Sequence, residues 1–198
     1  MEIESKIYTR TGDSGTTGLY KGPSTRNATQ SVVGGGQVSK SSLRVATYGM
    51  VDELNATVSA AKAFSNHEDI KKLLGRIQHK LMNIASILAS EQSNPPKETL
   101  PILSELDVIG LERCIDYFTH ELPPISNFII AGLNQAGAML DVARTVCRRT
   151  ERQIVLLSDT ESVPPVIQKF LNRLSDLLFV LERYEHHQSG FGDVMWEK

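Results

Sequence analysis

Residues 164–187 read PPVIQKFLNRLSDLLFVLERYEHH, and this stretch decides the fold. Its apolar residues return every three or four positions, which is the spacing of one face of an α-helix. A start at Pro164-Pro165 is favourable because proline is tolerated in the first turn of a helix. The apolar face consists of seven side chains: Ile167, Phe170, Leu171, Leu174, Leu177, Leu178 and Leu181. The spacing predicts a helix from about Pro165 to about His187.

The same period recurs in four earlier segments. It predicts helices over about 48–65, 67–93, 103–120 and 135–157, and proline pairs at 95–96 and 123–124 end the second and third. Residues 1–46 are rich in Gly, Ser and Thr and indicate an extended loop. Because the chain shows no convincing strand and no internal repeat, we expect an all-α fold, a five-helix bundle with an extended N-terminal loop segment.

The overall composition of the chain argues against several classes of protein. At 198 residues and 40% hydrophobic content, one domain is expected, with a loop segment at 1–46, a bundle at 47–187 and a tail at 188–198. A formal charge of -2 argues against a nucleic-acid binder, and no apolar run approaches the ~18 residues that span a bilayer. The start lacks a signal-peptide core, and neither cysteine has a metal-ligand spacing, so we expect a cytoplasmic protein.

Arginines crowd the fourth predicted helix. Arg144, Arg148 and Arg152 follow one another at i, i+4 and i+8, and Arg149 adds a fourth charge. Like charges at this spacing destabilise a helix by roughly 0.2–0.5 kcal/mol for each pair, so the row needs a counter-charge. Two sources stay open at this point, a bound polyanion or carboxylates of the protein such as those at 141 and 151.

Two further polar groups could bind a ligand. The segment 8–18, YTRTGDSGTTG, offers glycines and backbone N–H groups that can approach phosphate oxygens, although a solvated tail has the same composition. Asn172 and Asp176 share a face of a leucine-rich helix, where a ligand or an interhelical hydrogen bond would satisfy them. Asp52 and Glu53 suit a helix N-terminus, and they are also candidate counter-ions for Arg144.

In order and spacing, these pieces resemble the PduO-type ATP:cob(I)alamin adenosyltransferases. The matching segments are KIYTRTGDSGTTGL at 6–19, YGMVDELN at 48–55, FIIAG at 128–132, ARTVCRRTERQIV at 143–155 and LNRLSDLLFVLERY at 171–184. The resemblance implies a homotrimer with sites between subunits, which transfers the 5′-deoxyadenosyl group of Mg-ATP to cob(I)alamin and releases triphosphate. It implies Mg²⁺ as a cofactor, and a cobalt reductase and an adenosylcobalamin-dependent enzyme as further partners.

The resemblance also assigns residues. It implies that Arg144 pairs across the subunit interface with Asp52, and that Phe128 occupies the lower face of the corrin, where it makes Co(II) easier to reduce. Without the resemblance, Phe128 would be interpreted as a core aromatic. The implied ATP-binding residues are Thr9, Arg10, Thr11, Gly12, Asp13, Gly15, Thr17, Gly18, Lys40, Arg148, Arg149, Glu151, Arg152 and Asn172. Among these, Glu151 is the candidate for a ribose hydroxyl or for Mg²⁺.

The chain departs from the family pattern at several positions. Gln37 stands where an arginine is common, residues 21–33 read as an insertion, and Ala131-Gly132-Leu133 replaces Pro-Gly-Gly. These departures motivate a second hypothesis, a non-catalytic nucleotide or corrinoid carrier or sensor. Glu182, in a leucine-rich helix, has no explanation at this level.

Other residues suggest alternatives. A ferritin-like metal bundle would use Asp116 and His120, but the Glu-x-x-His pairs of such proteins are absent from the sequence. Adjacent histidines point about 100° apart on a helix, so His186-His187 is interpreted as a solvated helix end. Trp196 is expected to pack against the bundle or a neighbouring subunit.

Overall fold

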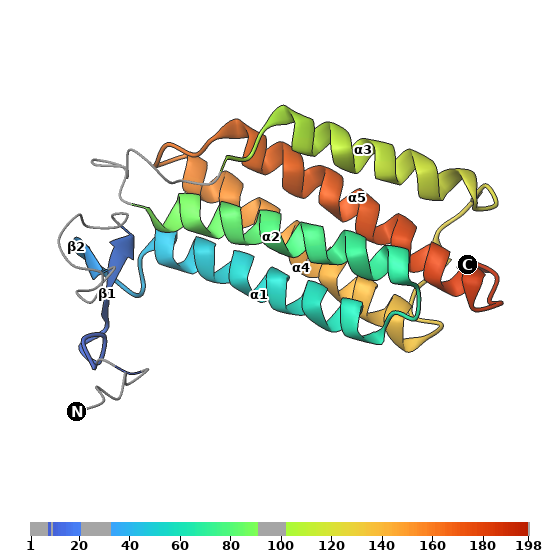
Figure 1. Ribbon diagram of the computed structural model, residues 1–198, viewed down its shortest axis with the longest axis horizontal. Helices are drawn as coiled ribbons and strands as arrows, with labels where there is room; N and C mark the ends of the chain where they lie inside the picture. Colours follow the sequence, from blue (N-terminus) through green and yellow to red (C-terminus); the bar gives the residue numbers. More distant parts are fainter. Residues whose placement is uncertain (1–7, 9, 21–32, 91–101, 198) are drawn as a thin grey trace, which may run out of the picture.

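The computed structural model describes residues 8, 10–20, 33–90 and 102–197. These ranges contain five helices, which lie side by side along the long axis of the molecule (Figure 1). The helices are α1 (Leu43–Phe64), α2 (Glu68–Ala89), α3 (Glu105–His120), α4 (Gln135–Ser158) and α5 (Pro165–Gln188). The predicted helical bundle is confirmed. Residues 21–32 of the predicted insertion, and the proline pair at 95–96, lie outside the described residues.

The core lies between α1, α2, α4 and α5, and α3 packs on the outer side of α5. The predicted apolar face of α5 is buried along its whole length, from Ile167 to Leu181. Apolar stripes of α1 and α2 face it, including Val51, Leu54 and Leu74, each of them fully buried. Removal of this apolar surface from water is the main stabilising contribution to such a bundle.

Local side-chain contacts fix where the helices begin. Ser42 caps α1, since its Oγ accepts from the N–H of Val45, and the helix therefore starts about five residues before the predicted Tyr48. Ahead of α3, the N–H of Ser104 donates to Asp107 Oδ2 at 2.8 Å. Of the other predicted helix ends, those at 120, 135 and 165 coincide with the observed ends, and the rest differ by one to four residues.

The prediction that the chain contains no strand was wrong. Strands β1 (Thr16–Tyr20) and β2 (Val33–Ser39) pair antiparallel, with Thr16 opposite Ser39 and Gly18 opposite Gln37. Glycines within both strands hide the alternation of apolar and polar residues that signals a strand. A second pair joins β3 (Ile129–Ile130) to β4 (Val194–Met195), which are far apart in the sequence.

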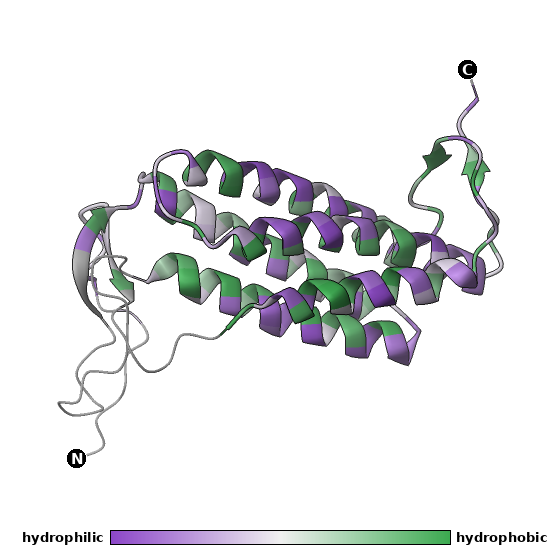
Figure 2. Ribbon diagram, turned by 90° about the horizontal axis from the view of Figure 1, so that it is seen from above, coloured by the Kyte–Doolittle hydropathy of each residue, from purple (hydrophilic) through white to green (hydrophobic). Residues whose placement is uncertain are grey.

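The two strand pairs lie at opposite ends of the bundle (Figures 1 and 2). The β1–β2 hairpin precedes α1, and β3–β4 connects the segment before α4 with the segment after α5. Helix surfaces show apolar and polar stripes in Figure 2, as expected where one face of each helix meets the core. Among the described helices, none has both the length and the apolar composition for crossing a bilayer.

Candidate active site

The Gly/Thr loop forms a turn that Lys40 holds together. Arg10 has a φ of 60°, in the left-handed region that residues other than glycine rarely adopt, and Gly15 has a φ of 81°. Lys40 Nζ donates to the carbonyl of Gly12 at 2.8 Å, and the N–H of Lys40 donates to the carbonyl of Gly15 at 2.9 Å. A Cβ at position 12 would lie 3.1 Å from Lys40 Nζ, so glycine lets the ammonium group lie against the loop backbone. The predicted loop and the predicted lysine therefore form one cationic turn.

Gln37 belongs to the same segment. Thr16 Oγ1 donates to Gln37 Oε1 at 3.2 Å, and Thr17 lies opposite Val38 in the hairpin. The side chain at position 37 thus fixes the two strands to each other. Asp13 is exposed on the turn, and Thr9 lies outside the described residues.

The arginine row on α4 is only partly neutralised by the chain itself. Arg144 donates to Asp141 Oδ1, with contacts of 2.8 and 2.6 Å, and Arg149 pairs with Glu53 on α1 at 2.6 Å. Arg148 and Arg152 are exposed and form no hydrogen bond or ion pair with another described residue. The protein's own carboxylates therefore account for two of the four guanidinium groups.

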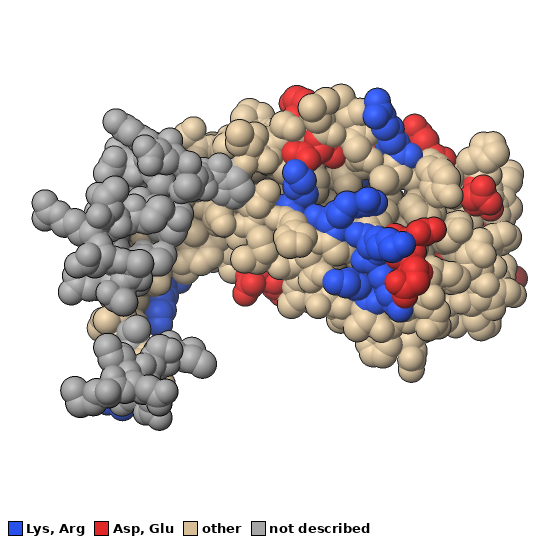
Figure 3. Space-filling model, in the orientation of Figure 1, with Lys and Arg blue, Asp and Glu red and all other residues tan. Residues whose placement is uncertain are grey.

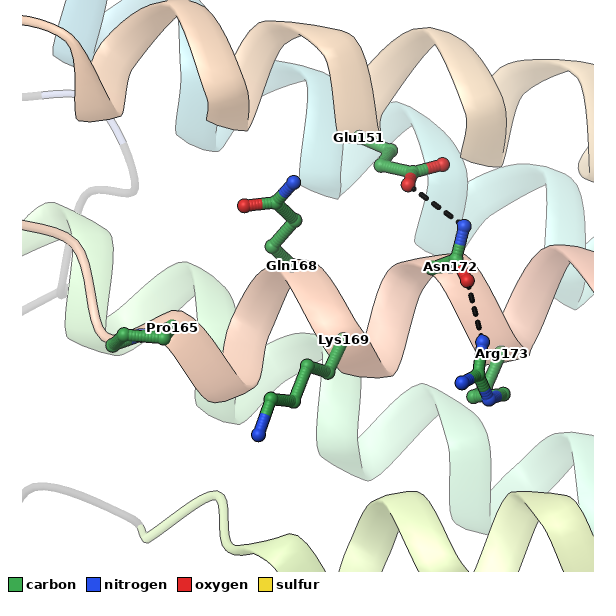
Figure 4. A pocket seen from close by; sticks show the side chains of 6 residues that line it. All are labelled: Glu151, Pro165, Gln168, Lys169, Asn172 and Arg173. Atoms are coloured by element: carbon green, nitrogen blue, oxygen red, sulfur yellow. Dashed lines mark hydrogen bonds between the residues drawn. The ribbon is translucent and has the colours of Figure 1, made fainter.

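A hydrogen-bonded chain of side chains crosses the groove between α4 and α5 (Figure 4). Asn172 Nδ2 donates to Glu151 Oε1 at 3.0 Å, and Arg173 Nη1 donates to Asn172 Oδ1 at 2.6 Å. Arg173 is held in turn by Glu112 of α3 at 2.9 Å. A cavity of about 370 Å³ opens here, lined by Glu151, Pro165, Gln168, Lys169, Asn172 and Arg173. Asn172 thus makes an interhelical hydrogen bond, which was one of its two predicted roles. It also lines a cavity, as a ligand-binding residue would.

A second hollow, of about 200 Å³, lies further along the same two helices. Its lining residues are Arg144, Arg148, Ser175, Asp176, Phe179 and Val180. The predicted pair Asn172 and Asp176 therefore faces two neighbouring hollows. Cys147 lies buried between the helices, where burial raises the pKa of its thiol and Sγ donates to the carbonyl of Leu171, so it is not a nucleophile.

Another group of basic side chains lies over the middle of α2 and its neighbours, on the face seen in Figure 3. Asp and Glu side chains border this group closely (Figure 3). Among the described ion pairs, Lys80 of α2 lies 2.6 Å from Asp107. Such mixed charge is typical of a solvated helix surface.

Phe128 is an exposed aromatic and not part of the core. Its side chain is 77% exposed, and its ring meets that of Trp196 edge to face, with 6.4 Å between centroids. The N–H of Trp196 donates to the carbonyl of Phe128 at 2.8 Å, and Asn127 Nδ2 donates to the carbonyl of Trp196. The interpretation of Phe128 as a core aromatic was wrong. Trp196 was expected to pack against the bundle or a neighbouring subunit, but within this chain its ring contacts Phe128, between α3 and α4, and stays 43% exposed. A large aromatic held at the surface suits binding of a flat ligand.

Asp52 is exposed on α1, and within this chain Arg144 bonds to Asp141 instead. The predicted pair between Asp52 and Arg144 involves two subunits, so it stays a prediction. Asp116 and His120 are exposed on α3, and the described residues contain no group of three or more His, Cys, Asp or Glu side chains placed to hold a metal ion.

Two polar residues lie on the buried face of α5, one that sequence reasoning misread and one that it left unexplained. His186 is 1% exposed, so its interpretation as part of a solvated helix end was wrong, and Nε2 accepts from the N–H of Leu133 at 3.1 Å. Glu182 is also 1% exposed and accepts from the N–H of Gly132 at 3.2 Å. The missed signal is spacing, because positions 182 and 186 continue the four-residue step of Leu174 and Leu178.

Comparison with known proteins gives the same family as the resemblance. A family model described as cobalamin adenosyltransferase matches residues 7–185. The chain belongs to this family. Its match to the cobalamin adenosyltransferase family includes the N-terminal loop and all five helices.

Individual members of the cobalamin adenosyltransferase family are similar to this chain over nearly its whole length. Corrinoid adenosyltransferase PduO of Citrobacter freundii is 40% identical over 189 residues, 96% of this chain, although the chain spans only 52% of that protein. A corrinoid adenosyltransferase of Bacillus subtilis is 36% identical over 197 residues, with 98% of this chain and 93% of that protein covered. A variant of the PduO-type ATP:corrinoid adenosyltransferase from Lactobacillus reuteri, complexed with cobalamin and ATP, superposes with a TM-score of 0.85 at 32% identity, covering 98% of this chain and 100% of that one.

Proposed function

We propose that the protein transfers the 5′-deoxyadenosyl group of ATP to cob(I)alamin, giving adenosylcobalamin and triphosphate. The observation that carries the proposal is the pair Arg148 and Arg152, which project from α4 without a described partner beside the groove that Glu151 and Asn172 line. Two unneutralised guanidinium groups next to a polar cavity suit a nucleotide phosphate chain.

The residues at the phosphate end act by charge. In the proposed step, cobalt supplies both electrons of the new bond to C5′, the C5′–O5′ bond breaks, and its electron pair leaves with triphosphate. Negative charge grows on the leaving oxygen, and cations held in place beforehand stabilise such charge most effectively. Arg148, Arg152 and Lys40, with the N–H groups of the turn at 11–14, are assigned this role.

Glu151 is assigned to the ribose or the metal. Its Oε1 is occupied by Asn172 Nδ2, which orients the carboxylate across the α4–α5 groove. Oxygen donors of this kind suit Mg²⁺, which binds nucleotide phosphates with few protein ligands. Bound Mg²⁺ would neutralise part of the charge on the phosphates.

The corrin is assigned to the surface next to the phosphate site, toward the β3–β4 end of the bundle, because cobalt must reach C5′ of the bound ATP. Phe128 presents an exposed ring there, and Arg144 lines the hollow beside Phe179. We assign Phe128 to the lower face of the corrin, and we assign Asp52 of a second copy to Arg144. Ring stacking on Phe128 would exclude a lower axial ligand and so favour reduction of Co(II).

We also propose a homotrimer with sites between subunits, and the position of the N-terminal loop supports it. The hairpin projects beyond the end of the bundle (Figure 1), and the side chains of Lys40 and Thr16 bond within their own segment. A second copy would bring its α4 arginines to this loop. Free thiols at Cys114 and Cys147 suit the cytoplasm, where a cobalt reductase and an adenosylcobalamin-dependent enzyme would supply and consume the corrinoid.

A spectroscopic assay tests the proposal. The purified protein is incubated with Mg-ATP and chemically reduced cobalamin, and the spectrum of adenosylcobalamin is expected to develop. No conversion above a protein-free control contradicts the proposal. Binding of ATP or cobalamin without conversion would instead indicate a carrier or sensor.

Two substitutions test the separate roles assigned to Arg148 at the phosphates and Phe128 at the corrin. Arg148→Ala removes a cation from the phosphate site, so kcat/KM for ATP should fall by about tenfold to a hundredfold, the usual size for a lost charged hydrogen bond. Phe128→Ala should slow cobalt reduction and leave the KM for ATP unchanged. Arg113→Ala, at an exposed position on α3, is the control. Equal and mild effects of Arg148→Ala and Phe128→Ala would contradict the assignment.

A further inference from the structure

Helix α5 holds the segment that follows Phe128 through two consecutive backbone amides. Glu182 Oε1 accepts from the N–H of Gly132 at 3.2 Å, and His186 Nε2 accepts from the N–H of Leu133 at 3.1 Å. The two acceptors are four residues apart and therefore stack on one face of the helix. Each is 1% exposed. This arrangement fixes two neighbouring peptide groups to a rigid element.

The helix that follows this segment is shaped around the imidazole. A Cβ at Gly137, in the first turn of α4, would lie 2.1 Å from His186 Nε2, so only glycine permits the contact. Asn134 caps the same helix by accepting from the N–H of Gly137 at 2.7 Å, and its Nδ2 donates to Ser189 Oγ at 3.1 Å. Residues 132–137 are therefore held from both sides.

The other end of the segment carries Phe128. Strand β3 starts at the next residue and pairs with β4, whose position depends on the buried ion pair between Arg183 and Asp193 at 2.7 Å. Between β3 and the amides held by α5 lies one residue, Ala131. Loss of the contacts from Glu182 and His186 would therefore reach the Phe128 ring through a backbone stretch of only a few residues.

Burial of an ionisable carboxyl here is energetically costly. The pKa of Glu182 is raised to about 7. Burial is the largest cause, Asp141 and Asp193 also raise the pKa, and the N–H of Gly132 and the charge of Arg144 lower it. An apolar residue would avoid this cost but would leave the Gly132 N–H without an acceptor. Strongly perturbed carboxyl groups of this kind concentrate at functional sites.

We propose that Glu182 and His186 are positioning residues, which hold the 131–134 backbone so that Phe128 meets the corrin at the correct height. Neither residue touches the reacting atoms. The inference rests on the proposed function, because it requires a corrinoid at Phe128. It assigns a use to a carboxyl and an imidazole that core packing alone does not explain.

Amide hydrogen exchange tests the structural half without any substrate. Glu182→Met keeps the length of the side chain and removes the acceptor, and exchange in residues 129–134 should accelerate by about tenfold, as expected for one lost hydrogen bond. Glu182→Gln keeps an acceptor oxygen and should exchange as the wild type does. The matched control is Glu185→Met, since Glu185 is also 1% exposed on α5 but bonds to Ser65 and His67 on the α1–α2 side.

Steady-state kinetics test the functional half. Glu182→Met should raise the KM for cobalamin by about fivefold to tenfold while the KM for ATP stays unchanged, and Glu182→Gln should restore the wild-type value. Glu185→Met should lower stability without changing the ratio of the two KM values. A purely structural role of Glu182 would affect both substrates alike.

The outcomes separate the two proposals. A wild-type protein that does not turn over contradicts the proposed function, and the exchange measurement still reports on the loop. A wild-type protein that turns over, combined with unchanged exchange or an unchanged KM for cobalamin in Glu182→Met, overturns the positioning role. Faster exchange together with a selective rise in the KM for cobalamin supports it.

Discussion

Protonation of Glu182 should make the stability of the protein depend on pH. The pKa of this residue lies at about 7 in the fold against an ordinary 4.5, so the folded state binds the proton more tightly than the unfolded state. The stabilisation from the bound proton is complete below about pH 4.5 and is lost as the pH rises through about 7. Glu182→Gln lacks this titration. Its melting temperature relative to wild type should therefore increase between pH 5 and pH 8 in thermal unfolding experiments.

His186 titrates in the opposite sense. Burial lowers its pKa, with Asp193 opposing, so its contribution is present above the ordinary value of about 6.5 and is lost as the pH falls below it. Both proteins in the comparison contain His186, so its effect cancels. A difference in melting temperature that stays constant from pH 5 to pH 8 would contradict the assignment for Glu182.

The structural setting of some single residues could be predicted from the sequence, and that of others could not. Of the two counter-charges left open for the arginine row, carboxylates of the protein serve Arg144 and Arg149, whereas Arg148 and Arg152 have no described partner. The bond of Lys40 to the loop was not predicted, and its contact with a nucleotide stays a prediction. The burial of Glu182 and His186 could have been found from their spacing, but their partners could not, because they are backbone amides of another segment and leave no trace in the side-chain pattern.

The junction between α4 and α5 should tolerate no side chain at Gly137. Gly137→Ala would force a Cβ into the imidazole of His186, and overpacking of this kind costs about 1–3 kcal/mol. We expect denaturant unfolding to show a loss of that size in the free energy of unfolding. The control is Gly110→Ala in α3, where a Cβ would meet no described atom within 4 Å, and helix propensity should favour alanine there. Equal effects at the two positions would contradict the packing argument.

Elements were predictable where their pattern is local. Apolar residues at helical spacing located all five helices, and proline marked the start of α5. The β1–β2 hairpin was missed because its strands carry four glycines and little alternation. The β3–β4 pair joins two-residue strands some sixty positions apart, and no local period can reveal such a contact.

Mixing of impaired subunits tests whether the site spans two copies. Lys40→Ala weakens the loop and Arg148→Ala weakens the helix, so each variant alone should keep about a tenth of the wild-type activity or less. In mixed oligomers, sites that combine an intact loop with an intact helix should restore activity in about a quarter of the sites, if mixing is random and each site uses two subunits. Activity is measured after the two variants are co-refolded. The control is refolding of each variant separately. If the mixture is no more active than these controls, the loop and the helix of each site belong to one chain.

Trp196 gives the protein an internal optical probe. It is the only tryptophan in the sequence, and its ring lies against Phe128 through the β3–β4 contact. Its fluorescence therefore originates at one place, the surface assigned to the corrin. A corrinoid seated there would absorb the emitted light by energy transfer, whereas ATP does not absorb at the wavelengths of tryptophan emission and would leave it nearly unchanged. Binding of the corrinoid can thus be followed without any label, also in the presence of ATP.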